Sequence, residues 1–183
     1  MDASIAHRPE DWNPSLPRNS SFELCQPEFM VTSPLSDLPR YIYGTTRLGD
    51  GSLPFDQRVA IAAVGIGAAG WIHTSHQYGD ALSVLRTALD QDRSSFQGAI
   101  FKIGWDDPAQ IKEQIELQIE ALGMSSMPIG QLCLGDKLSK ELVTGGTKIE
   151  ELQNLKRSGL VGRYVLEVFP WTTERPLEAL RAG

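Results

Sequence analysis

Trp71-Ile-His-Thr-Ser-His-Gln-Tyr-Gly79 is the stretch that decides the fold, and it holds two of the three histidines of the chain. Its first five residues have the apolar and β-branched character of a buried strand, and the Gly-Asp pair that follows opens an amphipathic pattern. Three polar side chains therefore fall at or just past the carboxyl end of a strand: His73, His76 and Tyr78. Proteins of the α/β class usually carry their chemistry there. We predict that this stretch forms the wall of a pocket.

Short apolar segments alternate with helical patterns from Arg40 onward, which is typical of βαβ units and a parallel sheet. Strands are expected over 41–43, 71–75, 99–103, 129–134 and 160–168. Helices are expected over 55–64, 81–89, 107–123, 147–159 and 173–181. The sequence thus predicts an α/β fold, a partial (β/α) TIM-barrel-like domain over 40–183 with about five parallel strands, whereas a complete barrel has eight.

The helix expected over 107–123 has the clearest boundaries. Asp107 is placed to cap it, Pro108 fits its first position and Gly123 fits its end. Apolar residues recur at helical spacing and are expected to face the sheet: Ile111, Ile115, Ile119 and Leu122. The glycines in Gly65-Ile-Gly67 come before a strand rather than after one, so they indicate a helix end and a turn and not a phosphate-binding loop.

Residues 1–39 differ in composition from the rest, because six of the eleven prolines lie there. This pattern predicts an irregular, proline-rich arm. The arm also carries apolar side chains, such as Trp12, Phe22 and Phe29, which would suit docking on the domain. A docked arm and a solvated tail therefore both remain open. A docked arm would cover an open edge of the sheet, as would a second copy of the chain in a homo-oligomer.

Composition excludes several classes of partner. The net charge of −6, without clustered Lys and Arg, excludes nucleic acid and an anionic membrane surface as partners. No apolar run approaches the ~20 residues that span a bilayer, and the N-terminus has no signal region. Cys25 and Cys133 have no metal-ligand spacing and indicate reduced thiols. We therefore expect a cytoplasmic protein that binds a small molecule.

Four segments between about Tyr43 and Glu167 resemble, in order, the aldo-keto reductase family. The 73–79 segment His-Thr-Ser-His-Gln-Tyr-Gly is similar to the family's Asp-Thr-Ala-x-x-Tyr-Gly signature. Tyr43-Gly-Thr-Thr-Arg-Leu-Gly49 is similar to its first strand, and Ile100-Phe-Lys102 resembles the strand that carries its lysine. The segment 119–136 resembles its next helix and the strand that normally ends in His-Asp.

The resemblance implies a catalytic tetrad of Asp, Tyr, Lys and His, of which this chain keeps half. The tyrosine corresponds to Tyr78 and the lysine to Lys102, whereas His73 stands in place of the aspartate and Gly135 in place of the histidine. In that family the tyrosine gives a proton to a carbonyl oxygen, and the aspartate holds the lysine charged. A neutral histidine cannot anchor an ammonium group as a carboxylate does, so we expect Lys102 to be less firmly charged.

The resemblance gives less support to a cofactor. The 156–165 segment looks like the family's next strand, but Leu166-Glu-Val-Phe-Pro170 stands where the family has Gly-Val-Ser-Asn, whose Ser-Asn pair holds the nicotinamide. The sequence given ends at Gly183, before the family's last cofactor-binding strands. We therefore expect no cofactor, with NADPH as the alternative.

Other side chains are candidates for binding a substrate: His76, Trp105, Asp136 and Trp171. An aspartate after a strand is more often a turn or cap residue, and aromatic residues after strands are often ordinary core. His73 and His76 point to opposite faces of a regular strand, so no metal site is expected.

Three functions remain open on the sequence alone. The first is a pseudoenzyme with respect to NADPH, which acts as a proton-transfer lyase or isomerase through Tyr78, Lys102 and His73, or only binds a small molecule. The second is an NADPH-dependent carbonyl reductase with an altered tetrad, completed by a longer chain or a second subunit. The third is an assembly protein that recruits a partner through open sheet edges.

Overall fold

A computed structural model of the chain describes residues 39–104, 108–133, 138, 142 and 146–167. All of them belong to the compact unit Leu38–Gly183. Several expectations fall outside the described residues: positions 1–38 of the arm, the helix over 173–181, and the side chains of Asp107, Trp105, Asp136 and Trp171.

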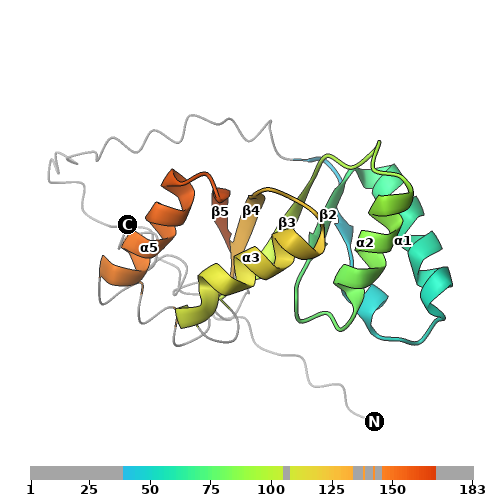
Figure 1. Cartoon of the computed structure of the whole chain (residues 1–183), viewed down its shortest axis with the longest axis horizontal. Coiled ribbons are helices and arrows are strands. Elements are labelled where there is room, and N and C mark those ends of the chain that lie inside the picture. Colours follow the sequence, from blue (N-terminus) through green and yellow to red (C-terminus); the bar gives the residue numbers. More distant parts are fainter. Residues whose placement is uncertain (1–38, 105–107, 134–137, 139–141, 143–145, 168–183) are drawn as a thin grey trace, which may run out of the picture. The chain divides into compact units, whose positions relative to one another are not determined.

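The described residues form one sheet of five parallel strands in the order β1-β2-β3-β4-β5 (Figure 1). The strands are β1 (Tyr43–Gly44), β2 (Trp71–Thr74), β3 (Gly98–Ile103), β4 (Met127–Leu132) and β5 (Val161–Leu166). Each strand pairs with the next one along the chain. The expected partial barrel of parallel strands is confirmed, with a first strand that is one residue shorter than expected and begins at Tyr43 rather than Tyr41.

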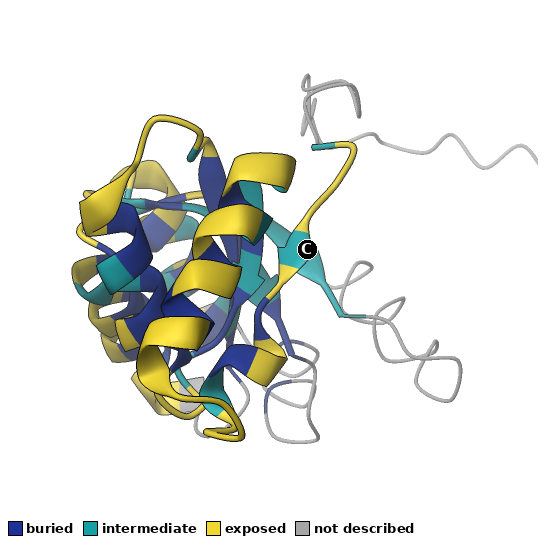
Figure 2. Ribbon diagram, turned by 90° about the vertical axis from the view of Figure 1, so that its right-hand side faces the viewer, coloured by how far each residue is buried: buried dark blue, intermediate teal, exposed yellow. Residues whose placement is uncertain are grey.

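The helices described between these strands lie on one face of the sheet (Figures 1 and 2). They are α1 (Phe55–Ala69), α2 (Ala81–Gln91), α3 (Ile111–Ala121) and α5 (Gly146–Arg157), with short 3₁₀ turns at Thr46–Gly49 and Pro108–Gln110. Right-handed crossovers that advance one strand at a time place every helix on the same side. None of the helices in the described ranges is long and apolar enough to cross a membrane.

The two faces of the sheet differ in burial. The side chains that point to the helices are fully buried, as shown by Ile72, Phe101 and Ile103. Tyr164 on the same face donates its hydroxyl to Leu152 O of α5 at 3.0 Å. Because successive residues of a strand alternate in direction, the neighbours of these residues point to the opposite face, called here the inner face. Several inner-face side chains are only partly buried and polar.

Helix α1 runs five residues beyond its expected end at Val64, so the interpretation of Gly65-Ile-Gly67 as a helix end and turn is wrong. Gly65 packs against the Tyr43 ring of β1, where a Cβ would approach the ring carbons to 2.6 Å, so glycine allows the helix to lie this close to the strand. The end comes at Gly70, which adopts a left-handed φ of 71°.

Helix α3 follows its pattern closely. Its expected stripe is buried against the sheet, with Ile111 and Ile115 fully enclosed. Gly123 ends the segment with a φ of 61°, as expected for a left-handed residue after a helix. The first turn is 3₁₀ rather than α, so the α-helix itself begins at Ile111.

Candidate functional site

Strand register brings the polar side chains of the inner face together at the carboxyl ends of the strands. His73 pairs with Ile100, and Lys102 lies two residues further along β3 on the same face. Lys102 pairs with Gln131, whose strand runs on to Cys133, and Gln131 pairs with Val165, two residues before Glu167. Residues paired in a parallel sheet share a face, so these five polar side chains form one cluster.

The centre of this cluster is an ion pair between β3 and the end of β5. Lys102 Nζ donates to Glu167 Oε1 at 2.7 Å, and the two side chains are only 19% and 10% exposed. Burial acts to lower the pKa of Lys102, but the hydrogen bond with Glu167, followed by the electrostatic contributions of Cys133, Glu167 and Tyr78, outweighs it and raises that pKa. The expectation that Lys102 is less firmly charged is therefore wrong.

His73 has the opposite electrostatic character. Burial, and then the positive charge of Lys102, lower the pKa of the His73 imidazole, while a hydrogen bond with Gln131 and the charge of Glu167 oppose this shift. Its Nε2 atom is buried and has no hydrogen-bond partner among the described residues. The expectation of a neutral histidine beside the lysine agrees with this direction.

We predict that this histidine makes the protein less stable in mild acid. A depressed pKa in the folded state favours folding while the group is neutral, so the contribution is present above the ordinary histidine pKa of about 6.5 and is lost as the pH falls through the folded value. Urea unfolding at several pH values between about 7.5 and 5 should show a falling free energy of unfolding. The fall should be smaller in His73→Gln; an identical pH dependence in that variant would contradict the prediction.

Cys133 lies beside the ion pair but is not poised to react. Burial first, and then the hydrogen bond and charge of Glu167, raise the pKa of the Cys133 thiol to about 12. Its backbone N–H donates to Ile103 O at 3.0 Å, which continues the sheet beyond β4. The thiol therefore stays protonated at neutral pH and acts as a small apolar group.

Tyr78 stands in a tight loop that packs against the 3₁₀ turn after β1. Its backbone N–H donates to Ser75 O at 3.1 Å. Its carbonyl oxygen accepts, at 3.0 Å, from the N–H of Ala81, which is the first residue of α2. Gly49 lies directly against this loop, since a Cβ on Gly49 would approach Tyr78 O to 1.6 Å. The phenol is partly buried against the core, within electrostatic range of Lys102.

Two glutamines of α3 fix the strand ends that carry the cluster, and sequence analysis missed both. Gln118 Nε2 donates to Lys102 O at 3.1 Å, and Gln118 Oε1 accepts from the backbone N–H of His76 at 3.0 Å. Gln114 Oε1 accepts from Gly104 N at 2.8 Å. Both residues lie on the buried side of α3 among its isoleucines. A polar residue within an apolar stripe must find hydrogen-bond partners when it is buried, and this pattern could have indicated both glutamines from the sequence.

The predicted site residues thus separate into groups. Lys102 lies within electrostatic range of both His73 and Tyr78. His76 is held from α3 by its backbone, and Trp105, Asp136 and Trp171 lie outside the described residues. In the described part of the chain, no group of three or more His, Cys, Asp or Glu side chains is arranged to hold a metal ion.

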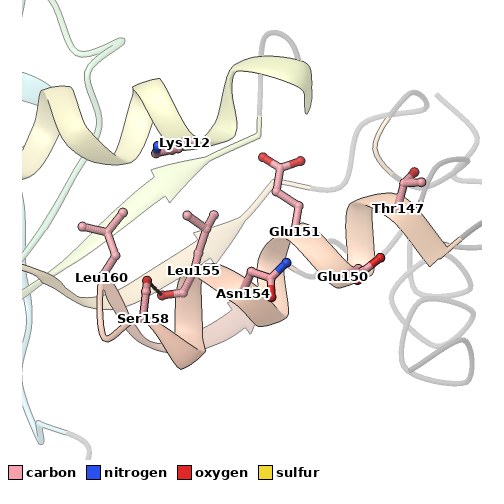
Figure 3. A pocket seen from close by; sticks show the side chains of 8 residues that line it. All are labelled: Lys112, Thr147, Glu150, Glu151, Asn154, Leu155, Ser158 and Leu160. Atoms are coloured by element: carbon pink, nitrogen blue, oxygen red, sulfur yellow. Dashed lines mark hydrogen bonds between the residues drawn. The ribbon is translucent and has the colours of Figure 1, made fainter.

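A separate open groove of about 460 Å³ lies on the helix side of the sheet, between α3 and α5 (Figure 3). Its lining includes Lys112 of α3 and a row of α5 side chains, among them Glu151 and Asn154. Lys112 is within 3.7 Å of Glu116, and Lys148 donates to Glu151 at 2.5 Å, so these charges are already paired within their helices. The groove contains none of the predicted site residues.

The sheet order, the helices on one face and the polar cluster at the carboxyl ends together define a (β/α)-barrel type of α/β protein. No protein-family model and no curated protein matches the sequence. Solved structures do match. One is a protein of Pseudomonas aeruginosa assigned to the aldo-keto reductases, with a TM-score of 0.62, 22% identity and coverage of 85% of this chain and 68% of that one.

Two further structures have the same fold. An aldo-keto reductase of Klebsiella pneumoniae in complex with NADPH matches 78% of this chain with a TM-score of 0.60 and 22% identity. The aldo-keto reductase AKR11C1 of Bacillus halodurans matches 75% of this chain with a TM-score of 0.57 and 20% identity. The chain spans only about half the length of these two structures, 49% in each case. Its fold is similar to part of the aldo-keto reductase fold.

Proposed function

We propose that the carboxyl ends of these strands bind a small carbonyl compound and transfer a proton to or from it without NADPH. The observation that carries this proposal is the buried Lys102–Glu167 ion pair, which keeps an ammonium group within electrostatic range of the phenol of Tyr78. A fixed positive charge near a carbonyl oxygen stabilises the negative charge that develops there. Tyr78 supplies the O–H that hydrogen-bonds to that oxygen.

His73 supplies the base in this proposal. Its imidazole is kept neutral, and its Nε2 atom has no partner among the described residues. It accepts a proton from the carbon next to the carbonyl group while Tyr78 protonates the oxygen, so that the C–H electron pair becomes the C=C bond of an enol. In the second step an enol O–H returns a proton to the Tyr78 phenolate as a C=O bond forms again. In an isomerisation the imidazolium gives its proton to a different carbon; in a lyase reaction a leaving group departs with its bonding electrons and takes that proton.

The sequence at the end of β5 supports the absence of NADPH chemistry. In the resemblance set out above, Val168 and Phe169 take the places of the Ser-Asn pair that holds the nicotinamide carboxamide. Neither side chain has a hydrogen-bonding group. The negative charge of Glu167 stands directly before them on the chain.

A second candidate, NADPH-dependent carbonyl reduction, is favoured by the same ion pair. Glu167 restores a carboxylate beside Lys102, so the loss of the aspartate at position 73 no longer argues against a charged lysine. The Klebsiella pneumoniae structure that matches the fold was solved with NADPH. Hydride transfer would then replace proton abstraction at the same carbonyl group, with Tyr78 as the acid in both reactions.

Deuterium exchange separates the two candidates. The protein is incubated in D₂O with a panel of small α-hydroxy ketones and aldehydes, and exchange of the C–H next to the carbonyl is followed by NMR without NADPH. We expect exchange that falls about 10²-fold or more in Tyr78→Phe and in His73→Gln. Tyr41→Phe is the matched control, because Tyr41 is 66% exposed at the surface.

Other outcomes would contradict the first candidate. Micromolar NADPH binding, together with carbonyl reduction that is lost in Tyr78→Phe, would establish the second candidate instead. Neither exchange nor reduction across the panel would reject both. Size-exclusion chromatography with light scattering on the same samples tests the third function, since a stable monomer disfavours assembly through sheet edges.

A further inference from the structure

Glu167 occupies a place in the fold that the resemblance gives to no catalytic or positioning residue. It follows β5, and its backbone N–H donates to Leu132 O at 3.0 Å, so the sheet hydrogen bonding fixes its main chain. Its side chain is nine-tenths buried, and Oε1 accepts the 2.7 Å hydrogen bond from Lys102. The carboxylate therefore reaches the lysine from the far side of β4.

We propose that Glu167 is the positioning carboxylate of this site and holds the Lys102 ammonium from β5 in place of a carboxylate on β2. The inference rests on the proposed function for its catalytic meaning, since Lys102 assists the reacting oxygen only if a carbonyl compound binds there. The structural part is independent of any substrate. It concerns which acidic group keeps Lys102 charged and in place.

The described residues that act on Lys102 leave Glu167 as the anionic partner among them. They are His73 on β2, Tyr78 in the loop after β2, Cys133 after β4 and Glu167 after β5. Tyrosine phenols and cysteine thiols are ordinarily uncharged at neutral pH, and a histidine carries either no charge or a positive one. Among these groups only the glutamate carries a negative charge at neutral pH.

A carboxylate at position 73 could hold Lys102 in place of Glu167. His73 and Lys102 point to the same inner face, two residues apart in register on adjacent strands. The charge of Lys102 already acts on the imidazole and lowers its pKa. An aspartate at position 73 would experience the same field with the opposite sign and would be stabilised as an anion.

The test is a charge swap that requires no substrate. The titration of Lys102 is followed by NMR of its side-chain amine in the wild type, Glu167→Gln, and the double variant Glu167→Gln/His73→Asp. We expect the pKa of Lys102 to fall in Glu167→Gln and to return toward the wild-type value in the double variant. Glu151→Gln removes the partner of Lys148 on α5 and should leave Lys102 unchanged.

Rescue from β2 separates a positioning role from a merely structural one. An unchanged Lys102 titration in folded Glu167→Gln, or a lowered one that the folded double variant does not restore, would overturn the proposal. If Glu167→Gln does not fold, the double variant tests the proposal by itself. A double variant that folds with a raised Lys102 pKa supports the proposal, whereas one that does not fold shows that Glu167 acts through packing alone. A Lys102 response without any proton exchange would contradict only the proposed function.

Discussion

Replacing Gly49 by alanine is expected to lower the free energy of unfolding by about 3 kcal/mol, the upper end of the usual cost of overpacking, and to displace Tyr78. A Cβ at this position would lie 1.6 Å from Tyr78 O and 2.4 Å from Tyr78 C. Both contacts are to backbone, so no side-chain rotation relieves them. The loop that carries Tyr78 must move, and proton transfer should fall with it. Urea unfolding and the exchange assay on the same samples measure the two effects.

Gly67→Ala is the matched control for this prediction. Gly67 lies within α1, and a Cβ there would meet no atom within 4 Å. Alanine forms helix more readily than glycine, so this variant should be more stable than the wild type by up to about 1 kcal/mol. Equal stability and activity in Gly49→Ala and the wild type would show that the 3₁₀ turn and the Tyr78 loop are not in close contact.

The sequence predicted the order and type of the elements because local patterns determine them. Alternating apolar segments and amphipathic stretches located β2, β3, β4 and β5, and the left-handed glycine after α3 was evident from its place behind the isoleucine stripe. The length of α1 was not predictable in this way. Its C-terminal part packs closely at Gly65 against the Tyr43 ring, a contact between residues 22 positions apart that no local pattern marks.

The candidate site could be predicted only in part, for the same reason. The 73–79 signature placed His73 and Tyr78 near the end of β2, and Lys102 followed from its strand. The partner of Lys102 is 65 residues away in sequence, and its identity depends on the register of three strands. No local pattern marks Glu167 as an ion-pair partner, since it stands in a segment that departs from the family's motif.

Lys102→Met is expected to destabilise the protein by about 3 kcal/mol, because it leaves the Glu167 carboxylate buried without its cation. Glu167 Oε2 has no hydrogen-bond partner among the described residues, so Lys102 is the main compensation for burying this charge. The value is at the lower end of the usual range because the Lys102 side chain keeps 19% exposure. Thermal or urea unfolding at pH 7 measures the loss.

Removing both charges should be much less costly than removing one. In Lys102→Met/Glu167→Leu the two new side chains are apolar and similar in length to the originals. The desolvation cost of the ion pair then disappears together with the attraction between its charges, so the free energy of unfolding should return to within about 1 kcal/mol of the wild-type value. A double variant that is as unstable as Lys102→Met would show that the unpaired charge of Glu167 is not what destabilises Lys102→Met, and would contradict the prediction.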